Sequence, residues 1–160
     1  MKYTLLFSLF PLLIFSQVQI GSDIDSEAID DQNGYSVSLS SDGTIVAIGA
    51  RYNGHVGSIF QAPGHVRVYE NIGGIWLQIG DDIDGEALGD QSGSSVSLSS
   101  DGSIVAIGAP NNEGVTGFSS GHVRVYENIG GIWTQIGDDI DGNVLVTVVV
   151  VESLYQVMVV

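Results

Sequence analysis

The chain has 160 residues and a formal net charge of −15, because 19 acidic side chains face only four lysine and arginine side chains. So acidic a surface repels phosphate backbones and acidic lipid headgroups, which argues against nucleic-acid and membrane-surface binding. The sequence has no cysteine, which excludes disulfides and thiolate metal sites. Its 22 glycines favour a turn-rich β protein over a helical one.

Residues 1–16 have the pattern of a secretory signal peptide. Lys2 precedes an apolar run over residues 5–15, and Ser16 follows as a small residue at the cleavage position. The alternative is a membrane anchor or a buried first strand. The run is shorter than the ~20 residues of a spanning helix, and Pro11 interrupts it. We therefore expect cleavage after Ser16, no membrane insertion afterwards, and a secreted or cell-surface protein.

Residues 17–142 are built from an internal repeat. The segment 20–50 returns almost unchanged at 79–109, and its opening returns a third time at Ile136. A repeat of this length is typical of one supersecondary unit used as a building block. The sequence therefore predicts two complete units, at about 20–78 and 79–135, and the start of a third at 136.

Each unit is predicted to contain four strands and no helix. In chain order, the strands of the first unit are an alternating segment, a continuously apolar segment, a second alternating segment and a segment that follows a Gly-Gly turn: 36–40, 44–50, 65–70 and 75–83. Val37 and Leu39 share one face of the first strand. Ser-Asp-Gly at 41–43 and 100–102 is a strong hairpin signal, because glycine tolerates a positive φ.

Four short antiparallel strands per unit predict an all-β fold of β-propeller-type blades. A blade buries its faces only against neighbouring blades, so each blade must present the same packing surface. This requirement explains why the sequence GHVRVYENIGGIW occurs identically at 64–76 and 121–133. The alternative is a β-sandwich made of duplicated hairpins.

The repeats also resemble a known family. The sequence SVSLSSDGTIVAIGA at 36–50, followed by GHVRVYEN at 64–71, is similar to the FG-GAP-like repeats of secreted bacterial surface proteins, distant relatives of the integrin α-subunit propeller. The likeness covers about residues 18–142. It implies a propeller used for extracellular binding or adhesion within a larger protein, with an extracellular protein or glycan and further blades of that parent protein as partners.

The sharpest metal hypothesis is a weak calcium site at the turn that contains Asp82, Asp84 and Glu86. Similar carboxylate clusters lie at the start of each repeat, before its first predicted strand, at 23–27, 81–86 and 138–141, and calcium prefers closely spaced oxygen ligands on a turning backbone. The alternative is that these acids are solvated loop residues that keep exposed sheet edges soluble. The integrin relatives hold calcium in a different loop, which this chain shortens to a lone Asp42 or Asp101.

The histidines and serines give no catalytic signature. His65 and His122 occupy matching positions at the start of a strand but lack close ligand spacing, so a packing role is favoured over zinc binding. Arg67 with Glu70, and the equivalent pair in the second unit, are expected to form exposed charge pairs. The serines lie in strands without a nucleophile elbow, and a site within the repeat would occur twice. We expect no enzyme and no cofactor. A binding or adhesion module, a structural spacer and a fragment without function remain, with a hydrolase the least favoured reading.

Residues 143–160 abandon the repeat directly after Gly142. As protein, this tail is a valine-rich, aggregation-prone strand interrupted by Glu152. When the codons that residues 151–159 require are regrouped in another frame, they permit Val-Ser-Leu-Ser-Ser-Asp-Gly, the repeat's own sequence. We therefore expect the tail to be a frameshift product, with the third blade encoded in the DNA.

Overall fold

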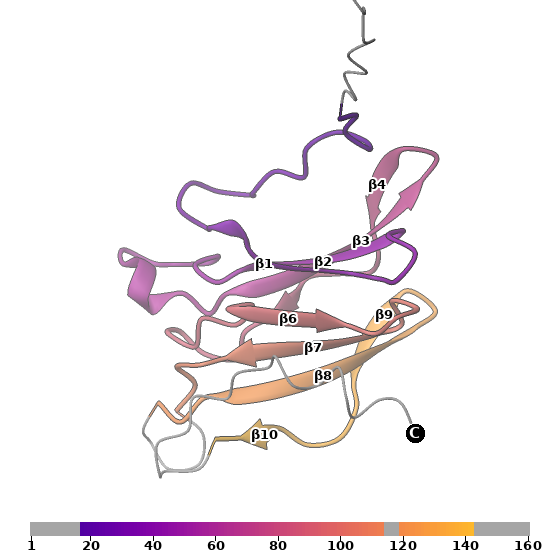
Figure 1. Cartoon of the computed structure of the whole chain (residues 1–160). Coiled ribbons are helices and arrows are strands. Elements are labelled where there is room, and N and C mark those ends of the chain that lie inside the picture. The colour runs from indigo at the N-terminus through magenta and orange to yellow at the C-terminus, as the bar shows by residue number, and fades with distance from the viewer. Residues whose placement is uncertain (1–16, 114–118, 143–160) are drawn as a thin grey trace, which may run out of the picture.

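A computed structural model of the chain describes residues 17–113 and 119–142. This part of the chain confirms the all-β prediction, since it forms two antiparallel sheets (Figure 1). Among the described residues, no helix has the length and hydrophobicity to cross a bilayer. The predicted signal peptide and the predicted frameshifted tail both lie outside the described residues, so these two expectations remain predictions.

The first sheet contains the strands of the first repeat and, at residues 83–84, a short strand from the start of the second. Its strand order is β1-β2-β3-β4, with β5 paired to the free part of β3. A short 3-10 helix, η1 (Ile59–Gln61), interrupts the loop between β2 and β3. The strand bounds are β1 Asn33–Leu39, β2 Ile45–Ala50, β3 His65–Ile72, β4 Ile75–Gln78 and β5 Ile83–Asp84.

The second sheet reproduces the first in strand order and register. Ile45 pairs with Glu70 in the first sheet, and Ile104 pairs with Glu127 in the second. The strand bounds are β6 Ser95–Leu98, β7 Ile104–Ala109, β8 His122–Ile129, β9 Ile132–Gln135 and β10 Ile140–Asp141. The identical register follows from the near-identical sequences, which place the same hydrophobic pattern and the same turns in both units.

The predicted fourth strand is two strands in the structure. β4 and β5 lie one after the other along β3, and the chain leaves the ladder between them. Gly80 lies in this gap with φ of 71°, a left-handed conformation that interrupts a strand. The division places the acidic segment after Gly80 beside the start of β3 rather than at the end of a continuous edge strand.

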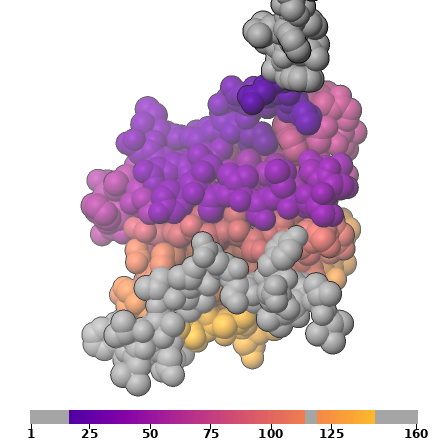
Figure 2. Space-filling view, viewed as in Figure 1, coloured from indigo at the N-terminus to yellow at the C-terminus, as the bar shows by residue number. Residues whose placement is uncertain are grey.

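The two sheets pack face to face, with β6 of the second sheet against β1 and β2 of the first (Figure 1). The space-filling view shows the two repeats in continuous contact along this boundary (Figure 2). Serines of β1 bond across it: Ser36 Oγ donates to the Gly93 carbonyl at 2.7 Å, and Ser38 Oγ accepts from the Leu98 amide at 2.9 Å. The polar face of β1 is therefore the inner face of the pair of sheets.

One hydrophobic core spans both sheets. Its buried members come from β2, β3 and β5 of the first sheet and from β6, β7 and β8 of the second sheet: Ala47, Val66, Val68, Ile83, Leu98, Val105, Ile107 and Tyr126. A smaller cluster of Val46, Ile48 and Tyr69 on the other face of the first sheet is covered by Ile24 and Trp76. The first sheet thus packs against the second repeat on one face and against Ile24 and Trp76 on the other.

Candidate metal centre

His65 and His122 begin the central strands β3 and β8 of the two sheets. His65 is paired on one side with Ala50 of β2 and on the other with Asp84 of β5. Both histidine side chains are only 1% exposed, and neither ring nitrogen of either side chain makes a hydrogen bond. A buried polar atom without a partner is uncommon in a folded protein, so each histidine needs a physical explanation.

Two carboxylates lie beside each histidine. In the first group, Nδ1 of His65 lies 3.3 Å from Oδ2 of Asp82 and 4.0 Å from Oε2 of Glu27. In the second group, Nδ1 of His122 lies 3.5 Å from Oδ2 of Asp139 and 3.8 Å from Oε2 of Glu86. Within each group, the potential ligand atoms all lie within 4.8 Å of one another.

Each group is assembled from three separate segments. The glutamate precedes the repeat's sheet, the histidine begins its central strand, and the aspartate follows the edge strand β4 or β9. The acidic turn between the repeats is therefore shared, because Asp82 completes the first group and Glu86 belongs to the second. Consecutive repeats are linked by one short stretch of acids.

A buried arginine holds the glutamate of each group. Nη1 of Arg67 lies 3.6 Å from Oε1 of Glu27, and Nη1 of Arg124 lies 3.4 Å from Oε1 of Glu86. Nη2 of each arginine donates to a backbone carbonyl of the same acidic segment, at 2.9 Å to Asp25 and at 3.0 Å to Asp84. Both arginines are thus buried and face these groups. The prediction that they form exposed charge pairs with the glutamates of β3 and β8 is wrong.

Burial lowers the pKa of His65, although the nearby carboxylates of Asp82 and Glu27 act in the opposite direction. The positive charge of Arg67 adds to the lowering of this pKa. Burial therefore favours the neutral imidazole of His65, in which one ring nitrogen carries a free lone pair. A neutral histidine beside two carboxylates offers a nitrogen and oxygen donors at one point, which is a donor set of metal sites.

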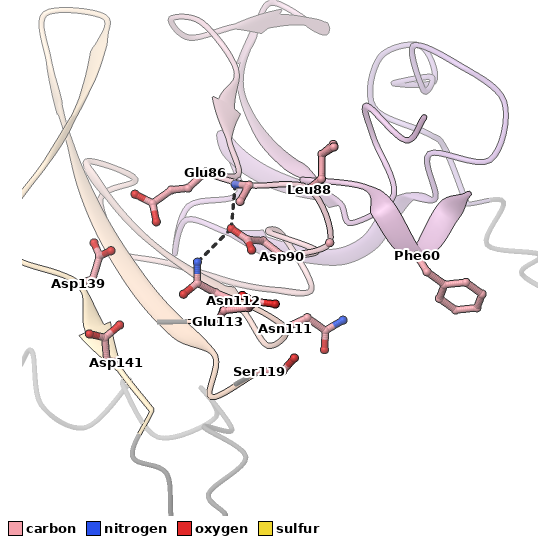
Figure 3. Close-up of a pocket in the computed structure, with 12 residues that line it drawn as sticks. Phe60, Glu86, Leu88, Asp90, Asn111, Asn112, Glu113, Ser119, Asp139 and Asp141 are labelled. Atoms are coloured by element: carbon pink, nitrogen blue, oxygen red, sulfur yellow. Dashed lines mark hydrogen bonds between the residues drawn. The ribbon is translucent and has the colours of Figure 1, made fainter. Parts of the chain in front are cut away.

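The second group opens into a pocket of about 750 Å³ (Figure 3). Glu86, Asp139 and Asp141 lie together on one side of it, and Asn111 and Ser119 lie away from them. The pocket is also lined by the turn at 87–90. In this turn the Asp90 carboxylate accepts hydrogen bonds from the Ala87 amide at 3.0 Å and from the Asn112 side chain at 3.1 Å. The carboxylates of this group are therefore reachable from solvent, whereas the histidine is buried behind them.

The structure divides the residues predicted to bind calcium. Asp82 points into the first group, Glu86 into the second, and Asp84 belongs to neither. The two groups also include histidines for which a packing role was favoured. The signal that could have revealed the groups was the repeat itself, since Glu27, His65 and Asp82 have equivalents at Glu86, His122 and Asp139. Spacing within a single motif does not reveal ligands that come from three segments.

No protein-family model and no curated protein sequence matches the chain. The resemblance to FG-GAP-like repeats therefore remains a prediction from the quoted motifs.

Proposed function

We propose that the chain is a non-enzymatic, secreted or cell-surface module of β-propeller-type repeats, and that it acts by binding an extracellular protein or glycan. The observation that carries this proposal is how the two repeats fit together. The second repeat buries Leu98, which is 5% exposed, against the first repeat. The first repeat leaves the equivalent Leu39 56% exposed.

The exposed face of the first repeat therefore has the composition of an interface. Val37 and Leu39 of β1 correspond to Val96 and Leu98 of β6, and the latter pair packs into the shared core. A further repeat could cover the exposed pair in the way that the first repeat covers the second. This supports an array of stacked repeats within a larger protein, as blades of a propeller would form.

The hydrogen bonds of the serines in and after β1 support a structural role for these residues rather than a role as a catalytic nucleophile. Ser36 and Ser38 are engaged with the neighbouring sheet, and Ser40 bonds to Asp42 within the hairpin turn at 2.7 Å. These hydroxyl groups hold strands and turns together. The polar pocket beside the second repeat is a more suitable surface for a ligand, because it combines acids, amides and the exposed ring of Phe60.

The proposal is tested by binding of the immobilised full chain to arrays of glycans and extracellular matrix proteins. We expect saturable binding to one ligand class, weakened at least tenfold by the pocket variant Asn111→Ala combined with Phe60→Ala. The variant Ile72→Ala, on the far hairpin of the first repeat, serves as the control and should bind normally. Absence of binding to every array member would favour a spacer, and turnover of a chromogenic glycoside or ester would favour a hydrolase.

A further inference from the structure

We propose that each repeat carries a site for a divalent transition metal ion, with zinc as the best fit. The first site consists of Glu27, His65 and Asp82, and the second consists of Glu86, His122 and Asp139. This inference stands apart from the proposed function, since a metal can stabilise the repeats whether or not they bind an extracellular ligand.

The donor set distinguishes zinc from calcium. Each group offers one imidazole nitrogen and two carboxylates, and zinc is commonly bound by three such protein ligands with a fourth position for water. Calcium instead takes six to eight oxygen ligands. Imidazole is a good ligand for zinc, copper, iron and nickel, whereas hard cations such as calcium prefer oxygen ligands.

The distances match a tetrahedral site. With zinc bonds of about 2.0–2.2 Å to nitrogen and oxygen, neighbouring ligand atoms are about 3.3–3.6 Å apart. The histidine-to-aspartate distances of 3.3 and 3.5 Å already lie in or at this range. The histidine-to-glutamate distances of 4.0 and 3.8 Å are slightly longer. Both glutamates are about half exposed, at 49% and 46%, so a small movement of each carboxylate would close the difference while its other oxygen stays near the arginine.

The buried histidines are the second observation that points to a metal. Nδ1 of each ring faces the two carboxylates but makes no hydrogen bond. A metal ion bound at Nδ1 would give this buried atom a partner. The metal would supply Nδ1 with a partner that the polypeptide alone does not provide, whereas Nε2 of each ring would stay without one.

The surrounding charges favour a cation. Each group sets two carboxylates against one arginine, and an additional aspartate, Asp84 or Asp141, follows two residues after the aspartate ligand. Arg67 and Arg124 contact the oxygen of the glutamate that faces away from the histidine. Such outer contacts hold a ligating carboxylate in orientation, as is usual around protein metal sites.

The experiment uses the untagged full chain after removal of metals with a chelator. Zinc is titrated by calorimetry, and cobalt(II) is titrated as a spectroscopic probe of tetrahedral coordination. We expect two equivalents of zinc per chain, an intense visible cobalt spectrum, and a higher melting temperature with zinc than with millimolar calcium. The variants Glu27→Gln and Glu86→Gln should each remove one equivalent or weaken it at least tenfold, as expected when a ligand is lost.

The glutamates are chosen because they are half exposed, so their loss should leave the fold intact by circular dichroism. His65→Gln and His122→Gln extend the test to the buried ligands. The exposed Glu70→Gln on β3 is the control and should keep both equivalents. The inference is overturned by the absence of heat and of a cobalt spectrum, by an unchanged stoichiometry in the glutamate variants, or by calcium stabilising the chain more than zinc. None of these outcomes depends on binding to glycans or matrix proteins.

Discussion

Asp42 and Asp101 show how single residues hold the hairpins of both repeats. The Asp42 carboxylate accepts hydrogen bonds from the Thr44 amide at 3.0 Å, the Ser40 hydroxyl at 2.7 Å and the Thr44 hydroxyl at 2.8 Å. The Asp101 carboxylate accepts the equivalent bonds from Ser99 and Ser103. These bonds favour the ionised carboxylate and lower the pKa of each aspartate from 3.8 to about 2.

The lowered pKa predicts a pH-dependent stability. Because the pKa is lower in the folded chain, the contribution of Asp101 is complete above its unfolded pKa of 3.8 and is lost as the pH falls through about 2. We expect Asp101→Ala to lower the free energy of unfolding at pH 7 by about 0.5–1.5 kcal/mol, the net worth of one hydrogen bond. Urea denaturation at a series of pH values measures this difference.

The variant Asp101→Asn is the matched control for the charge. It keeps an acceptor oxygen for the Ser103 amide, so we expect a smaller loss of stability at pH 7 than for Asp101→Ala. The stability difference between wild type and Asp101→Ala should narrow as the pH falls from about 4 to about 2. A difference that stays constant over this range would show that the charge of Asp101 does not stabilise the turn.

At the scale of the elements, local signals predicted the hairpins well. Ser-Asp-Gly at 41–43 and Gly73-Gly74 mark turns in the structure, because these residues specify a turn conformation without help from the rest of the chain. The division into β4 and β5 was missed, since a single positive φ at Gly80 interrupts a segment whose hydrophobic pattern is continuous. The two groups of one histidine and two carboxylates were missed because their members come from three segments that meet only after the sheet has formed.

The contact between the sheets leaves no room for a side chain on Gly49 of β2. A Cβ atom added there would lie 2.1 Å from the Gly93 carbonyl oxygen of the second repeat and 2.4 Å from Oγ of Ser36. We expect Gly49→Ala to lower the free energy of unfolding by about 1–3 kcal/mol, the usual cost of overpacking. Thermal unfolding followed by circular dichroism measures this effect.

Gly43→Ala separates crowding from backbone strain. Gly43 has φ of 72° but open space around an added Cβ atom, so its replacement costs only the left-handed conformation, about 1 kcal/mol. A Gly49→Ala chain as stable as the wild type, or less destabilised than Gly43→Ala, would mean that the sheets do not approach as closely as described.

At the scale of the whole molecule, the two repeats are equivalent in structure but not in environment. The all-β class could be predicted because it follows from hydrophobic alternation, and the duplicated sequence indicated two equivalent units. Which sheet face is buried and which is exposed could not be predicted from the sequence. Val37 and Val96 have the same neighbours in sequence and differ only in what packs against them. The apolar residues exposed on the first repeat have equivalents in the second repeat that are buried in the contact between the two. This pattern is typical of repeats that stack on one another.

The most direct test of this stacking is one comparison of thermal unfolding between Leu98→Ala and Leu39→Ala. Leu98 packs in the core between the repeats, whereas Leu39 occupies the equivalent position on the outer face of the first sheet and is exposed. We expect Leu98→Ala to lower the free energy of unfolding by about 2–5 kcal/mol, the range for a buried leucine. Leu39→Ala should change it by less than about 1 kcal/mol, as for surface substitutions. Equal losses at the two positions would contradict the stacking of the second repeat on the first.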